Sequence, residues 1–145
     1  MQAAELLKHA RSILDPALTT HGFAFEPGLI GVGSGGPFAQ GAYVRGDRRL
    51  EFSVRWSLGE VVYRVGNSLI SHEELMRVVA GPRKARYPGF SDDPLDGFRG
   101  LRHDLELYGG GFLRGTAEDF HSTVRRAAET RPKSGFGRLS DVEAG

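Results

Sequence analysis

Hydrophobic and polar side chains alternate strictly from residue 50 to residue 58, and this is the clearest pattern in the chain. The hydrophobic positions are Leu50, Phe52, Val54, Trp56 and Leu58. A period of two is typical of a strand with one buried face. Gly59-Glu60 then fits a two-residue type II′ turn, which requires glycine first. The predicted pairs on the buried face are Leu58 with Val61, Trp56 with Tyr63, and Val54 with Val65.

A second turn is expected within residues 46–49, so that an earlier strand precedes this hairpin. The registers that fit keep Ala39, Gly41 and Tyr43 on the buried face. The sequence therefore predicts a three-stranded antiparallel meander over residues 38–66, with residues 23–33 as a candidate fourth strand.

Helical spacing of apolar residues marks the rest of the chain. From Ala3 to Leu18 they recur every three or four positions, which indicates an amphipathic helix that Pro16 either kinks or restarts. Three more helices are expected after the meander, because each has a capping residue at its start and a glycine or proline at its end. Their limits are Ser71 to Gly81, Asp93 to Gly109, and Thr116 to Pro132.

The order of these elements is helix, meander, then three helices, without alternation of strands and helices. This order predicts the α+β class: an N-terminal helix, an antiparallel meander of three or four strands, and three helices mainly on one face of the sheet. The 145 residues suit one domain, which we assign to residues 1–131. Residues 132–145 are polar and are expected to form a short mobile tail.

Composition narrows the class of protein. The chain is 39% hydrophobic and 26% charged, which fits a globular domain with a core. Nineteen basic against eighteen acidic residues give a net charge of +1, which excludes a general polyanion-coating protein. The absence of cysteine excludes disulfides, thiolate metal sites and cysteine nucleophiles. With neither a spanning apolar run nor a signal-peptide pattern, we expect a cytoplasmic protein.

The predicted hairpin also places Arg55 opposite Arg64 on the outer face of the sheet. Like charges directly opposite each other are destabilising unless something compensates. Either Glu51 or a carboxylate from a helix neutralises the pair, or the two guanidinium groups receive an anionic ligand or a partner's carboxylate. The predicted ligand-binding residues are Arg55, Arg64, Gln40, Ser53 and Ser57.

A basic segment lies in the loop of residues 81–93. Its candidate partner-binding residues are Arg83, Lys84, Arg86 and Tyr87, with Arg77 upstream. Such a segment can contact phosphates or an acidic partner, but one short patch in a nearly neutral chain disfavours nucleic acid.

Three other motifs have simpler structural interpretations. Gly31–Gly36 matches G-x-G-x-x-G, yet a strand-like run follows it where a dinucleotide fold needs a helix, so a hairpin connection is expected and no cofactor. The acidic group Asp92, Asp93 and Asp96 fits the start of a helix better than a metal site. His103 and Glu106 fit exposed ion pairs with nearby arginines better than metal or acid–base chemistry, and His72 is expected at the surface.

Together these observations predict a non-enzymatic binding or protein-interaction module that acts through the outer sheet face or the 81–93 loop. We expect no catalytic residue, cofactor or metal, and the partner would be an unidentified protein or a small anionic ligand. The exposed sheet edges also make a homodimer plausible. The alternative is an enzyme with a dispersed site of His103, Glu106, Arg55 and Arg64, and a weak nucleic-acid binder comes third.

Overall fold

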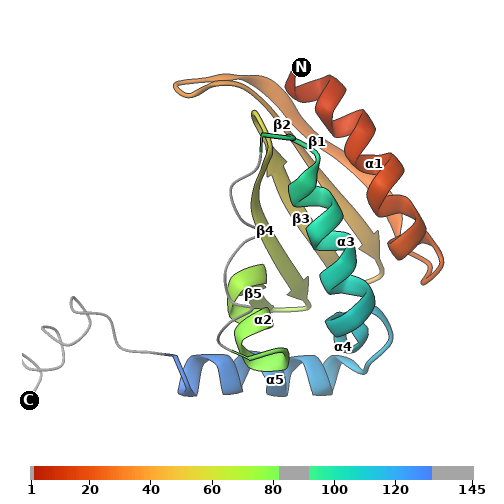
Figure 1. Ribbon diagram of the computed structural model, residues 1–145. Helices are drawn as coiled ribbons and strands as arrows, with labels where there is room; N and C mark the ends of the chain where they lie inside the picture. Colours follow the sequence, from red (N-terminus) through yellow and green to blue (C-terminus); the bar gives the residue numbers. More distant parts are fainter. Residues whose placement is uncertain (1, 82–91, 132–145) are drawn as a thin grey trace, which may run out of the picture.

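The computed structural model describes residues 2–81 and 92–131. Within these ranges, five antiparallel strands form one sheet in chain order (Figure 1): β1 (Ala24–Gly33), β2 (Gly36–Arg45), β3 (Arg48–Val54), β4 (Leu58–Val65) and β5 (Ser68–Ser71). The helices are α1 (Ala3–Thr19), α2 (His72–Val79), α3 (Asp96–Tyr108), α4 (Gly110–Leu113) and α5 (Ala117–Glu129). The predicted α+β architecture is confirmed, with β1 as the fourth strand; β5 and α4 were not expected.

Helix α1 packs the apolar stripe that the sequence predicted against the sheet. Leu6, Ala10, Leu14 and Leu18 are all buried on this side. The helix runs through Pro16 and ends at Thr19, so it does not restart at Asp15. The Asp15 carboxylate instead accepts a hydrogen bond from the Tyr43 hydroxyl. Burial, with this hydrogen bond, raises the pKa of Tyr43 far above its usual range.

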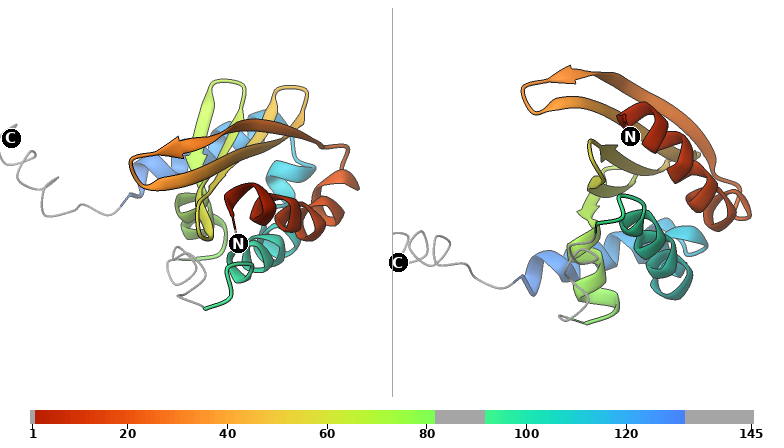
Figure 2. Two further views of the ribbon diagram at one scale, coloured as in Figure 1. Left: turned by 90° about the horizontal axis from the view of Figure 1, so that it is seen from above. Right: turned by 45° about the horizontal axis from the view of Figure 1, so that its top comes forward.

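The core lies between one face of the sheet, which we call the inner face, and the helices. Figure 2 shows α1 and α3 lying along the same side of the sheet. Aromatic contacts join the layers: Phe52 of β3 meets Phe98 of α3 edge to face, and Tyr63 of β4 meets Phe112 of α4 in the same way. In the described part of the chain, no helix is long and apolar enough to cross a membrane.

The β2–β3 register agrees with the prediction, since Ala39, Gly41 and Tyr43 lie opposite Val54, Phe52 and Leu50. The predicted β3–β4 register is wrong. No turn forms at Gly59-Glu60, because both residues lie within β4. The observed pairs are Leu50 with Tyr63, Phe52 with Val61, and Val54 with Leu58.

Two local features explain the different β3–β4 register. Gly59 lies so close to β3 that a Cβ atom there would come within 2.7 Å of Ser53 Oγ, so this glycine serves a close approach of two strands and not a turn. The pairing is irregular between Phe52 and Val54, where the ladder ends. The chain therefore reverses through Arg55, Trp56 and Ser57, and Trp56 is not part of the core.

The helix ends largely confirm the capping predictions. Ser71 Oγ accepts from the Glu74 amide at 3.2 Å, and Thr116 Oγ1 accepts from the Asp119 amide at 3.0 Å. The prediction for α3 is shifted, because the helix begins at Asp96 and Asp93 lies in the turn before it. The Asp93 carboxylate accepts from the Leu95 amide there at 2.9 Å.

The segment Gly31–Gly36 forms the end of the β1–β2 hairpin, as the absence of a following helix predicted. Gly33 pairs with Gly36 across a two-residue turn, and Gly36 has a φ of +100°, which L side chains rarely adopt. No helix begins at this loop, whereas in a dinucleotide-binding motif a helix N-terminus faces the phosphates there.

Buried polar side chains connect the sheet to the helices. The Arg48 guanidinium donates to the carbonyl oxygens of Phe112 and Gly115 at the end of α4. His72 is only 2% exposed, so the prediction of a surface position is wrong. Its Nε2 lies 2.9 Å from Asp104 Oδ2, and its Nδ1 lies 2.8 Å from the Tyr63 hydroxyl. This chain of hydrogen bonds joins β4, α2 and α3.

Replacing Asp104 should destabilise the fold measurably. In Asp104→Ala, His72 Nε2 loses its buried acceptor, and the expected loss of unfolding free energy is about 1–3 kcal/mol. Asp104→Asn keeps an acceptor oxygen and should lose less. Urea denaturation followed by circular dichroism measures both values. Glu106→Ala on the exposed side of the same helix is the control, and a loss there equal to that of Asp104→Ala would contradict the role of the buried network.

Candidate functional site

The face of the sheet opposite α1 and α3, which we call the outer face, carries the candidate site. Alternation along β2 and β3 places Phe38, Gln40, Glu51 and Ser53 on this face, while their neighbours point into the core. The hollows on the outer face of β2 and β3 are lined by strand and turn residues, with no residue from a described helix among them. No described helix therefore covers these side chains.

Two hollows on this face have lining residues in common, and we call them together the outer groove. They share Gln40, Ser53 and Glu60. The first, of about 300 Å³, also contains Glu26, Arg49 and Glu51. The second, of about 450 Å³, is lined by Phe38, Gln40, Ser53, Arg55, Trp56, Ser57, Leu58, Gly59 and Glu60. The groove thus has an ion-paired half and a half that combines aromatic side chains with one arginine.

The Arg55 side chain lies across the end of the β1–β2 hairpin. Its Nη1 donates to the Gly36 carbonyl at 3.0 Å, and its guanidinium carbon lies 5.7 Å from the centre of the Phe38 ring. A Cβ atom at residue 35 would come within 2.6 Å of Nη1, so the glycine there makes room for this arginine. Among the described residues, no carboxylate forms a salt bridge with Arg55.

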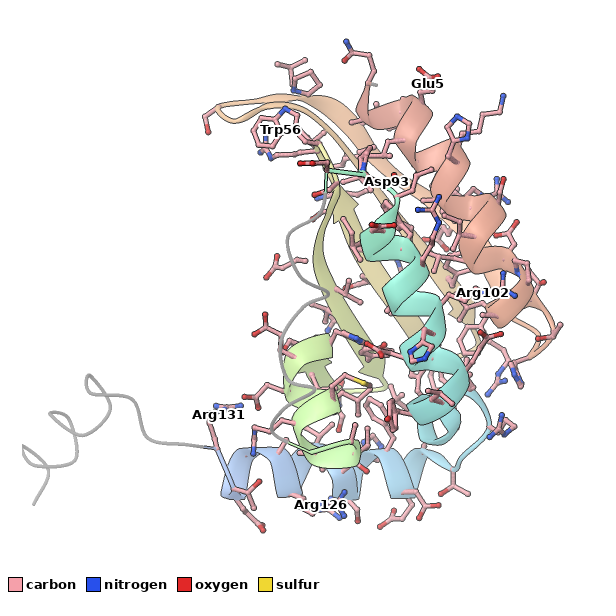
Figure 3. All side chains as sticks on the ribbon, viewed as in Figure 1. Glu5, Trp56, Asp93, Arg102, Arg126 and Arg131 are labelled. Atoms are coloured by element: carbon pink, nitrogen blue, oxygen red, sulfur yellow. The ribbon has the colours of Figure 1, made fainter. Side chains whose placement is uncertain are left out.

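Trp56 projects from the β3–β4 connection next to Arg55. It is 72% exposed, which is a large apolar surface to leave in water. Figure 3 shows its ring at the end of the sheet near the β1–β2 hairpin, far from α5. The Arg55 amide donates to the Ser57 carbonyl at 3.2 Å, and this tight reversal aims the Trp56 side chain outward.

The predicted pairing of Arg55 with Arg64 is wrong, because the residue opposite Arg64 is Arg49. Glu51 compensates this like-charged pair: its carboxylate lies 2.9 Å from Arg49 Nε and 3.5 Å from an Arg64 Nη atom. Glu26 adds a second contact to Arg49 at 3.2 Å. The hydrogen bond that Arg49 donates to the Glu51 carboxylate raises the pKa of Arg49. Arg64 is therefore ion-paired within the sheet, and Arg55 is not part of this group of charges.

The structure brings together four of the five predicted ligand-binding residues. Gln40, Ser53, Arg55 and Ser57 line one hollow, and Arg64 is absent from its lining. Phe38 and Trp56 join them as aromatic members that we did not assign to a site. The sequence held one signal for Phe38, since alternation places it on the same face as Gln40, but Trp56 was assigned to the core through the incorrect register.

The other predicted site residues do not converge on this groove. His103 and Glu106 belong to α3, which packs on the inner face, so the sheet separates them from Arg55 and Arg64. Among the described residues, no group of three or more His, Asp or Glu side chains could hold a metal ion. Arg77 donates to the carbonyls of Ala127 and Thr130 at the end of α5. The predicted partner-binding residues Arg83, Lys84, Arg86 and Tyr87 lie outside the described residues.

Neutralising Glu51 should expose the repulsion between Arg49 and Arg64. For Glu51→Gln we expect a loss of about 0.5–1 kcal/mol of unfolding free energy at low salt, because these ion pairs are partly exposed and screened. Urea denaturation at low and high salt measures the loss, which should shrink as salt rises. Glu60→Gln changes the net charge equally, and Glu60 forms no salt bridge with any described residue. Equal losses in the two variants would show that Glu51 does not compensate the arginines.

Comparisons with known proteins found no relative of this chain. No protein-family model, no curated protein and no solved structure matches the chain. A functional assignment therefore comes from the chemistry of the outer groove itself.

Proposed function

We propose that this chain is a non-enzymatic binding protein that holds an acidic segment of a partner protein in the outer groove. The observation that carries the proposal is the position of Trp56, 72% exposed beside an arginine that no described carboxylate neutralises. Tryptophan and arginine are the residue types most enriched where truncation costs the most binding energy. Both lie here in one hollow, next to a third large side chain, Phe38.

The position of Arg55 favours a carboxylate as the group it receives. Gly36 and the Phe38 ring hold the guanidinium in place, so little side-chain freedom is lost when a ligand binds. Its remaining N–H groups can bind a carboxylate in the planar, two-pronged geometry that arginine favours. Trp56 and Phe38 would then cover apolar side chains on either side of that carboxylate.

The rest of the groove favours a peptide over a polyanion. Gln40, Ser53 and Ser57 offer amide and hydroxyl groups that can pair with a partner's backbone. Glu26, Glu51 and Glu60 also lie in the groove and would repel a continuous phosphate backbone. This arrangement supports a partner with an isolated acidic group and disfavours nucleic acid on this face.

Trp56 provides a direct test, since it is the only tryptophan in the chain. The probes are short tryptophan-free peptides in which one glutamate is flanked by leucine or phenylalanine, together with the same peptides carrying glutamine. We expect glutamate peptides to shift Trp56 emission to shorter wavelength as they cover the ring. Arg55→Gln should weaken this binding at least about tenfold, because the charge-assisted hydrogen bonds are lost.

Arg64→Gln is the matched control, because it removes the same charge from the same face at a residue paired with Glu51. The affinity of this variant for the peptides should stay within about twofold of the affinity of the unsubstituted chain. Equal binding of glutamine and glutamate peptides, or equal loss in the two arginine variants, would overturn the role of Arg55. If no peptide alters Trp56 emission, the groove does not hold an acidic segment.

A further inference from the structure

The outward half of β1, Ile30–Gly33, is an edge strand that lacks the charged residues, proline and irregular pairing that usually protect such strands, since Pro27 and the irregular pairing precede it. β1 has no partner on its outer side in the described sheet, since the strand order begins with it. Leu29, Ile30 and Val32 are 68%, 60% and 78% exposed. The chain carries no charged residue from Pro27 to Val44, so neither strand of this hairpin end has a lysine or glutamate to deter pairing. Figures 1 and 2 show the hairpin end extending past β3 and β4.

The backbone of this half-strand is regular and can accept another strand. The irregular pairing lies between Pro27 and Ile30, and from Ile30 to Gly33 the residues pair in order with β2. Gly33 and Gly36 flank the two-residue turn, which makes them a hydrogen-bonded pair. Since such pairs alternate along an antiparallel ladder, Ile30 and Val32 direct their N–H and C=O groups away from β2.

We propose that a second copy of this chain pairs with β1 at this edge, antiparallel and centred on Gly31. In this register Ile30 of each copy lies opposite Val32 of the other, and each residue meets the backbone groups that its partner directs outward. The two Gly31 residues face each other as a non-hydrogen-bonded pair, where the strands approach most closely. The strand is thus complementary to itself about one two-fold axis.

Charge and side-chain size support a second copy over an unrelated strand. The segment from Pro27 to Val44 has no charged side chain of its own, so two identical segments meet without repulsion between their own side chains. Leu29 of each copy faces Gly33 of the other, so a large side chain lies over a residue with none. The two sheets become continuous, and both outer grooves lie on the same side of the dimer.

The size of the contact sets the expected strength of the dimer. Pairing a few residues of one strand buries less than the roughly 1,200–2,000 Å² of a standard stable interface. We therefore expect a dissociation constant of about 1–100 µM, with monomer and dimer in rapid exchange.

The absence of cysteine allows a precise cross-linking test of the register. At residue 31 an added Cβ would lie 3.4 Å from the Phe38 ring, an ordinary contact, so Gly31→Cys should fold. Two facing residues in a non-hydrogen-bonded pair have Cα atoms about 4.5 Å apart, within the range of about 4.4–6.8 Å that a disulfide spans. Mild oxidation of this variant, with copper–phenanthroline and oxygen as oxidant, should give a covalent dimer on a non-reducing gel.

Ser34→Cys is the matched control for cross-linking. Ser34 is exposed at the turn of the same hairpin, but in this register the two copies of residue 34 are about 20 Å apart, three residues on either side of the axis. Ser34→Cys should therefore oxidise to dimer much more slowly than Gly31→Cys. Equal rates for the two variants would overturn the proposed register.

Sedimentation of the full chain tests the dimer without cross-linking. We expect a weight-average mass that rises with concentration over about 1–200 µM. Ile30→Lys should hold the chain as a monomer, because it places two like charges at the paired edge. Leu69→Lys, on the opposite edge strand β5, should leave the dimer intact, with circular dichroism confirming that both variants fold. A monomer at every concentration, or dissociation by Leu69→Lys in place of Ile30→Lys, would overturn the proposal.

Discussion

The pairing of Val54 with Leu58 is the constraint on which the candidate site depends. It ends the β3–β4 ladder and forces the chain to reverse through Arg55, Trp56 and Ser57, beyond the inner face and its helices. Gly59 permits this arrangement, because any larger residue would collide with Ser53 at 2.7 Å. The most exposed aromatic side chain of the described residues and an arginine without a described salt bridge are therefore products of one strand register.

Buried polar groups, in addition to hydrophobic packing, connect the inner face of the sheet to the helices. Arg48 satisfies carbonyl oxygens at the end of α4 that have no partner within the helix. The hydrogen bonds of His72 with Tyr63 and Asp104 connect the sheet to two helices. Leaving any of these groups unpaired in the core would cost more than an exposed hydrogen bond contributes. α2, α3 and α4 are thereby tied to the inner face, and no described helix lines the outer groove.

The glycine-rich hairpin contributes to both proposed surfaces in different ways. Gly35 leaves room for the Arg55 guanidinium on the outer face, and Gly36 supplies the carbonyl to which Arg55 donates. Gly31 lies at the centre of the proposed pairing with a second copy. The variants that test the outer groove and those that test the β1 edge change different residues. A negative result for one proposal therefore leaves the other unaffected.

The sequence alone determined which side chains of β2 and of β3 up to Val54 face inward, and it determined most helix ends. Alternation and capping are local, so Leu50, Phe52 and Tyr63 were placed on the correct face, and Ser71 and Thr116 were recognised as caps. Only the tertiary structure decided the β3–β4 register, the separation of Arg55 from Arg64 and the burial of His72. Every even shift of a strand preserves the same alternation, so packing against α3 and α4 had to select among registers that the pattern leaves equivalent. The environment of His72 likewise depends on Asp104, which is distant in sequence and adjacent only after the helices have packed.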